Sequence, residues 1–177
     1  MVSTVRLARM AVLVALSAAG ANLKIPALTG TPALDSAPGY FAALALGAGE
    51  GAAVAGVGHL LTALTAGFPL TVPIHLLIAL GMAGCAAAVA AVARRLGLCW
   101  ACAAGVIVNG AVFPALFIPW FGVPFFAAMV VPLLVASALN LGLAALAYEV
   151  VIRARLWAPQ PRTTGQAASR HGEGNRR

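Results

Sequence analysis

Apolar segments follow one another almost without interruption along this chain, and they limit what it can fold into. Only 8% of its 177 residues are charged, whereas 62% are hydrophobic, and an ordinary soluble domain carries about a quarter charged residues. So few polar side chains cannot cover a surface that faces water. We therefore expect lipid to be the solvent for most of one compact domain.

Short stretches of proline, glycine and charge divide the apolar part into six segments. A spanning helix needs about 20 residues, and four of the six reach that length. The second and third are shorter and rich in glycine, so they fit either thin spans, which we favour, or a re-entrant hairpin. The sequence predicts an all-α membrane protein, a compact bundle of six transmembrane helices, as a domain of residues 1–155. The segments are Val5–Leu23, Ala37–Gly49, Glu50–Gly67, Pro73–Ala93, Leu98–Phe117 and Pro124–Ile152.

Individual residues predict where these helices begin and bend. Asp35 or Ser36 can cap the second helix, and Thr71 can cap the fourth. Pro114 and Pro132 each remove a backbone donor, so they are expected to kink the fifth and sixth helices.

The basic residues predict the orientation in the membrane. Six crossings bring both ends of the chain to one side, and six arginines at segment boundaries then share that side, with Lys24 opposite. Because positive charge is enriched on the cytoplasmic side, both termini are expected in the cytoplasm, with residues 156–177 as a disordered basic tail. The arginines are Arg6, Arg9, Arg94, Arg95, Arg153 and Arg155.

Two other interpretations of the basic residues are weaker. The net charge of +7 is one mark of nucleic-acid binding, but nearly all basic residues flank apolar segments or lie in the tail. Arg6 and Arg9, the apolar run after them and Ala19-Gly20-Ala21 also resemble a cleavable signal peptide. Its removal would leave five spans and the same orientation for the remainder.

The sequence contains no recognised motif for nucleotide or metal chemistry. It has no Walker A loop, no HExxH motif and no pair of carboxylates inside the apolar segments. We therefore expect neither an enzyme nor a bound metal or cofactor. If ATP energises this protein, a partner subunit must bind it. The acidic residues are Asp35, Glu50, Glu149 and Glu173.

Polar side chains within the apolar segments say most about function, because each costs free energy in hydrocarbon unless it finds a partner. His59, His75, Asn109 and Asn140 come from four segments, and Asp35 precedes the second. We expect them to project toward the outer half or the middle of the bilayer, which suits a pocket for a small, polar, mostly neutral molecule. For each residue alone, a hydrogen bond between helices explains its presence about as well, and for His59 better.

The same residues allow a second hypothesis, a small membrane enzyme or assembly factor. His59, His75 and Asp35 are residue types found in metal and acid–base sites. Such a site needs its side chains to converge. His59 is expected near the middle of the bilayer and His75 near its outer surface, so the sequence argues against this hypothesis.

One stretch of the sequence resembles a known family. Residues 30–82 read GTPALDSAPGYFAALALGAGEGAAVAGVGHLLTALTAGFPLTVPIHLLIALGM. Together with the alanine-rich first segment, they resemble the S components, the substrate-binding subunits, of energy-coupling factor (ECF) transporters. The resemblance covers about residues 5–153 and implies six helices in a bacterial plasma membrane that capture a vitamin from outside. Its most specific parts are Gly30-Thr31-Pro32, Asp35-Ser36-Ala37-Pro38 and Gly56-Val57-Gly58-His59.

The resemblance also implies partners. A transmembrane coupling subunit and two ATPase subunits complete the importer and hydrolyse the ATP. The small residues Ala11, Ala15 and Ala19 are implied to contact the coupling subunit, although their spacing alone fits packing within the chain equally well. For the pocket, the resemblance implies Asp35, Thr71, His75, Asn109 and Asn140, to which the polar pattern adds His59.

The substrate is less well determined. The patterns at residues 35–38 and 56–59 favour the subgroup linked with α-ribazole or another cobalamin precursor, with riboflavin, pantothenate or another vitamin as alternatives. A flat ring could stack on Trp120 or Phe121. Only Lys24 could readily pair with a carboxylate, so a strongly anionic substrate is disfavoured.

Overall fold

The computed structural model describes residues 3–27 and 32–154, and this part of the chain is helical apart from its connections and one isolated antiparallel bridge. The tail predicted at residues 156–177 lies outside the described residues. The elements in chain order are α1 (Thr4–Gly20), α2 (Ala37–Ala45), α3 (Ala48–Thr65), α4 (Val72–Leu96), α5 (Leu98–Ile107), the π-helical turn η1 (Val108–Val112), α6 (Phe113–Ala115) and α7 (Ile118–Arg153).

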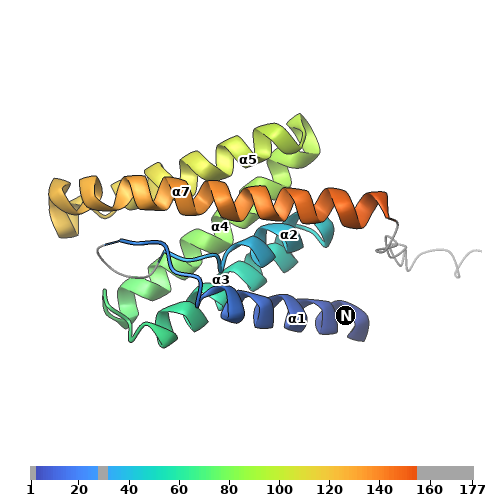
Figure 1. Cartoon of the computed structure of the whole chain (residues 1–177), viewed down its shortest axis with the longest axis horizontal. Helices are drawn as coiled ribbons and strands as arrows, with labels where there is room; N and C mark the ends of the chain where they lie inside the picture. Colours follow the sequence, from blue (N-terminus) through green and yellow to red (C-terminus); the bar gives the residue numbers. More distant parts are fainter. Residues whose placement is uncertain (1–2, 28–31, 155–177) are drawn as a thin grey trace, which may run out of the picture.

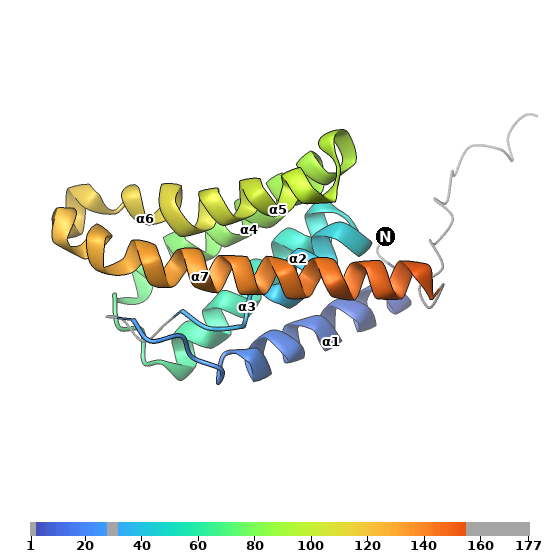
Figure 2. The ribbon, with the colours of Figure 1, turned by 45° about the horizontal axis from the view of Figure 1, so that its top comes forward.

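These elements form an elongated bundle of six helical segments, because α5, η1 and α6 follow one another as one segment (Figures 1 and 2). α7 runs along the bundle, and the start of α1 lies at the same end as the end of α7. The opposite end, hereafter the loop end, contains the α1–α2 connection, the α3–α4 turn and the start of α7.

Three of the segments are long and apolar enough to cross a membrane: Val72–Leu96, Leu98–Ala115 and Ile118–Arg153. α2 has only nine residues, which extend about 14 Å at helical rise, roughly half the thickness of the hydrocarbon core. The all-helical fold is therefore confirmed for the described residues. Six complete spans are not, since half of the segments do not reach spanning length or hydropathy.

The bundle exposes large apolar side chains and buries polar ones. On the outside, Leu80 and Leu146 are 70% and 64% exposed, whereas Thr62 and Ser137 inside are 0% exposed. A bilayer favours this distribution, because it keeps apolar side chains in hydrocarbon and gives polar side chains partners inside the protein. The distribution agrees with the inference from composition that lipid surrounds the chain.

Glycines let α2 and α3 approach closely. A Cβ atom on Gly39 would lie 2.7 Å from that of Ala55, and one on Gly51 would lie 2.4 Å from the Cα of Ala43. Close backbone approach increases the van der Waals contact that holds helices together in lipid. This packing supports α2, which is too short to span by itself.

Only one of the two predicted prolines lies beside a break in its helix. In the fifth segment, the π-helical turn η1 directly precedes α6, which contains Pro114. In α7 the residue with non-helical dihedral angles is Gly122, with φ 77°, and not Pro132. Glycine adopts this left-handed conformation without the clash that a Cβ atom would cause.

We predict that Gly51→Ala destabilises the protein by about 1–3 kcal/mol, because the added methyl group overlaps Ala43 and forces α2 away from α3. Gly49→Ala in the same helix is the control, since its added methyl group meets no described atom within 4 Å apart from its chain neighbours and the nearby backbone of its own helix, and alanine favours the helix. Thermal unfolding in detergent measures both variants. Equal melting temperatures would contradict the close packing of α2 on α3.

Candidate functional site

Asn140, on α7, holds the α1–α2 connection against the bundle. Its Oδ1 accepts hydrogen bonds from the backbone N–H groups of Ser36 (3.0 Å) and Ala37 (2.7 Å). Its Nδ2 donates to the carbonyl oxygens of Ala33 (2.8 Å) and Ala136 (2.9 Å). An amide side chain can accept two hydrogen bonds and donate two, so this side chain is fully used. Asn140 therefore acts as a clamp and not as a free ligand group.

The same amide caps the N-terminus of α2. The first N–H groups of a helix have no partner within it, and the sequence predicted Asp35 or Ser36 for this role. Ser36 occupies the N-cap position, but its side chain makes no capping hydrogen bond. The Oδ1 of Asn140 accepts from these N–H groups instead, from a residue 104 positions further along the chain.

Asp35 lies in the α1–α2 connection, where its carboxylate is buried and paired. Its Oδ2 accepts a hydrogen bond from Oγ1 of Thr62 at 2.5 Å, and its Oδ1 accepts one from Oγ of Ser36 at 3.0 Å. Burial raises the pKa of this carboxyl from its ordinary value, while the two hydrogen bonds act in the opposite direction. Asp35 thus ties the connection to α3.

The imidazoles of His59 on α3 and His75 on α4 are in direct contact. Nε2 of His59 lies 3.2 Å from Nδ1 of His75, and the ring centroids are 5.4 Å apart. The expectation that these side chains lie at different depths is therefore wrong. α3 and α4 form an antiparallel hairpin, and the two histidines lie eight residues before and eight after Gly67 in its turn, so they meet at one level.

The sequence argued against a metal or acid–base site because the two histidines were expected at different depths. Their contact removes that reason. Among residues 3–27 and 32–154, however, no three or more His, Cys, Asp or Glu side chains are grouped so that they could hold a metal ion. A hydrogen bond between two neutral rings, one donating and one accepting, accounts for the distance between the nitrogens.

Asn109 lies on the π-helical turn η1. Its Nδ2 donates a hydrogen bond to Oγ of the fully buried Ser137 at 2.8 Å, which fixes the side chain against α7. π-Helical turns inside α-helices are frequent at functional sites. The amide has capacity for four hydrogen bonds and makes this one within the described chain, so Asn109 retains donor and acceptor capacity.

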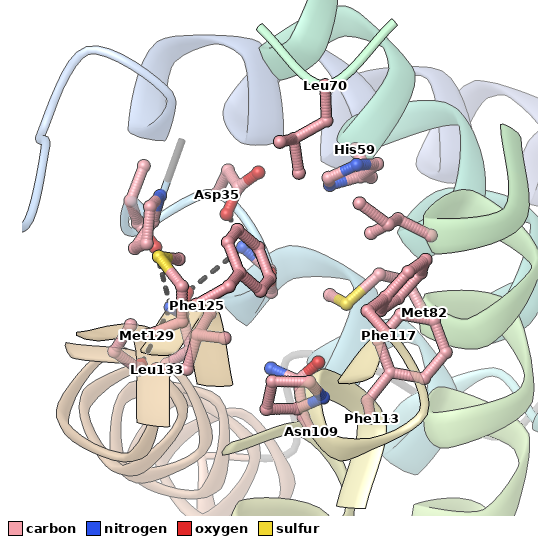
Figure 3. A pocket seen from close by; sticks show the side chains of 17 residues that line it. Asp35, His59, Leu70, Met82, Asn109, Phe113, Phe117, Phe125, Met129 and Leu133 are labelled. Atoms are coloured by element: carbon pink, nitrogen blue, oxygen red, sulfur yellow. Dashed lines mark hydrogen bonds between the residues drawn. The ribbon is translucent and has the colours of Figure 1, made fainter. Parts of the chain in front are cut away.

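A cavity toward the loop end collects four of these side chains, and Figure 3 shows Asp35, His59 and Asn109 around it. Asp35 comes from the α1–α2 connection, His59 from α3, Asn109 from η1 and Asn140 from α7. Most of the remaining wall is apolar or aromatic: Leu70, Ile78, Met82, Phe113, Phe117, Phe125, Met129 and Leu133.

The cavity is small as it stands. Its volume is about 80 Å³, and the empty space between atoms amounts to about 690 Å³ when the part open to the outside is included. Sites for small molecules usually measure about 300–1,000 Å³. A vitamin-sized ligand must therefore displace side chains or connections as it enters.

The predicted site residues do not all reach the cavity. Asp35, His59, Asn109 and Asn140 line it. His75 is fully buried and contacts His59 without lining the wall. Thr71 occupies the N-cap position of α4, where it is exposed and makes no capping hydrogen bond.

Sequence reasoning missed the aromatic part of the wall. Trp120 and Phe121 do not line the cavity, whereas Phe113, Phe117 and Phe125 do. Phe113 lies on α6, Phe117 lies in the connection to α7, and Phe125 lies beyond the non-helical Gly122. No single helix face joins these three residues, so helical spacing could not have identified them.

The alanines predicted to contact a partner lie on the outside of α1. Ala11, Ala15 and Ala19 are all exposed, whereas Leu13 and Ser17 are the buried residues of this helix. The alanines are thus not used to pack α1 against the described remainder of the chain.

Comparison with known proteins gives one match. A family model described as "ECF transporter, substrate-specific component" matches residues 5–152. Neither the curated proteins nor the solved structures include a match.

We predict that Asn140→Ala lowers the free energy of unfolding by at least about 2 kcal/mol, because it leaves buried N–H and C=O groups of the connection without partners. Asn22→Ala is the control, since this exposed amide bonds only to carbonyl groups at the end of α1, which it follows. Urea or thermal unfolding in detergent measures the difference. If the two variants lose the same stability, Asn140 is not a clamp.

Proposed function

This chain belongs to the family of substrate-specific components of ECF transporters, and we propose that it captures a vitamin or cofactor precursor in the cavity between α3, η1 and α7. The family match covers residues 5–152, so the chain is a membrane subunit of a transporter and not an enzyme. The chemistry of the cavity wall supports a more specific substrate.

The polar groups that line the cavity differ in how much hydrogen-bonding capacity they retain for a ligand. Asn140 uses its full capacity and both oxygens of Asp35 are engaged, whereas Asn109 and His59 each have one partner among the described residues. No described lysine or arginine lines the wall. A ligand therefore meets two neutral hydrogen-bonding groups and an aromatic surface, which favours a neutral molecule with a flat ring.

α-Ribazole, or a related cobalamin precursor, is the substrate that we propose. Its uncharged benzimidazole ring suits the wall formed by Phe113, Phe117 and Phe125, and its sugar hydroxyls can bond to Asn109 and His59. Riboflavin also has a flat ring but needs more room, and pantothenate has a carboxylate for which the described wall offers no cation. These two vitamins are the alternatives.

Other subunits complete the proposed importer. A transmembrane coupling subunit docks on the exposed alanines of α1, and two ATPase subunits hydrolyse the ATP, so this chain needs no cofactor of its own. The loop end faces the outside of a bacterial plasma membrane and both termini lie in the cytoplasm. The arginines near the opposite end support this orientation through the positive-inside rule.

We predict that the purified protein binds α-ribazole with one site per chain and that Asn109→Leu weakens the affinity about tenfold, the effect of one lost hydrogen bond. Asn22→Leu, a change of the same kind at an exposed position, leaves the affinity unchanged. Isothermal titration calorimetry measures all three, with riboflavin and pantothenate as comparison ligands. Binding of none of these compounds to the wild type would contradict the proposal.

We further predict that Ala15→Trp prevents assembly with the coupling subunit but spares substrate binding, because the indole holds the partner helix away from the exposed face of α1. Co-purification with the coupling subunit and calorimetry measure the two effects separately. Normal assembly together with lost binding would show that this face is assigned to the wrong partner.

A further inference from the structure

The histidine pair joins the cavity to the α3–α4 turn (residues 66–71). His59 lines the cavity, and its Nε2 faces Nδ1 of His75 at 3.2 Å. On the other side of His75, its Nε2 accepts a hydrogen bond from the backbone N–H of Leu70 at 3.5 Å. Phe68 packs its ring edge-on against His75 with centroids 5.7 Å apart. One buried imidazole therefore contacts both a cavity residue and the turn.

These contacts determine which ring nitrogens carry protons. A backbone N–H can only donate, so Nε2 of His75 must offer a lone pair to Leu70. A neutral imidazole has one proton, which then lies on Nδ1 of His75 and is donated to Nε2 of His59. The proton of His59 is thereby placed on its own Nδ1. This nitrogen has no hydrogen-bond partner among the described residues, so it remains a donor.

The same assignment disfavours a metal ion between the facing nitrogens. A metal requires a lone pair on each ligating nitrogen. Nδ1 of His75 carries the proton as long as Leu70 donates to the opposite nitrogen. The distance of 3.2 Å between the rings is thus the length of a hydrogen bond and not the edge of an unoccupied metal site.

We propose that His75 is a positioning residue that fixes the tautomer of His59, so that His59 offers an N–H donor and selects substrates with a hydrogen-bond acceptor at that point. The substrate half of this proposal rests on the proposed function. In the opposite tautomer, His59 would offer a lone pair and would select a donor instead. The specificity of the cavity is therefore set by a residue that does not line it.

The turn that donates to His75 is conformationally strained, which explains why it needs this support. Phe68 and Thr71 have φ values of 50° and 74°, a left-handed region that residues with a Cβ atom rarely adopt. Leu70, which lies between them, lines the cavity. His75 therefore holds a strained part of the cavity wall in place while it orients His59.

Two substitutions separate the two contacts of His75. Asn places its amide where the ring has Nδ1, so His75→Asn can still donate to His59 but loses the contact with Leu70. Gln places its amide where the ring has Nε2, so His75→Gln can still accept from Leu70 but loses the contact with His59. The two variants serve as controls for each other, since each removes the same imidazole.

The test uses the full chain in lipid nanodiscs without ligand, with ¹⁵N-labelled histidine and long-range ¹H–¹⁵N correlation spectra. We expect His59 and His75 of the wild type each to carry a proton on Nδ1 and none on Nε2. His59 keeps this single form in His75→Asn and becomes a mixture of tautomers in His75→Gln. A proton on Nε2 of either histidine in the wild type overturns the proposal, and this result requires no variant to fold.

A second measurement addresses the substrate half, with α-ribazole as the probe. We expect His75→Gln to weaken its affinity about tenfold, because the donor on His59 is no longer fixed, and His75→Asn to weaken it much less. Equal losses in the two variants overturn the role in specificity. If the wild type does not bind α-ribazole, the proposed substrate is wrong, while the spectra still decide the tautomer.

Discussion

Asn140 makes four hydrogen bonds that hold the α1–α2 connection and the start of α2 against α7. α2 is too short to cross the hydrocarbon core, so its first turn begins inside the bundle, where water cannot satisfy its N–H groups. The amide on α7 satisfies them and at the same time binds Ala33 in the connection. Because one side chain fixes both the start of α2 and the path of the connection, it also fixes this side of the cavity.

Around this clamp, the polar side chains of the interior have two different roles. Asn140, Asp35 and Thr62 make hydrogen bonds between different segments of the chain and so hold the fold together. Asn109 and His59 are oriented by buried partners but keep capacity toward the cavity. In lipid, a polar group without a partner is costly, so the spare capacity of two groups at one cavity indicates a place where a ligand can supply partners.

The sequence predicted the helices and most of the polar residues that meet at the cavity, because apolar periodicity and the cost of burying polar groups both act locally. It could not show that Asn140 holds the connection in place whereas Asn109 is available to a ligand. The two roles depend on which atoms of distant segments lie beside each amide. The depth of His59 was misjudged because the sequence did not show that α3 and α4 form a hairpin, in which residues equally far from Gly67 meet at one level. The phenylalanines were missed because breaks at residues 116–117 and at Gly122 separate them, and no helical spacing predicts which of them face the cavity.

If this cavity holds one small neutral molecule, native mass spectrometry of the protein, incubated with α-ribazole, riboflavin and pantothenate together, detects it. We expect one adduct per chain, carrying a ring compound without a carboxylate, and its loss in Leu133→Trp, where the indole fills the cavity. An adduct that persists in Leu133→Trp, or no adduct with the wild type, would show that the cavity is not the binding site.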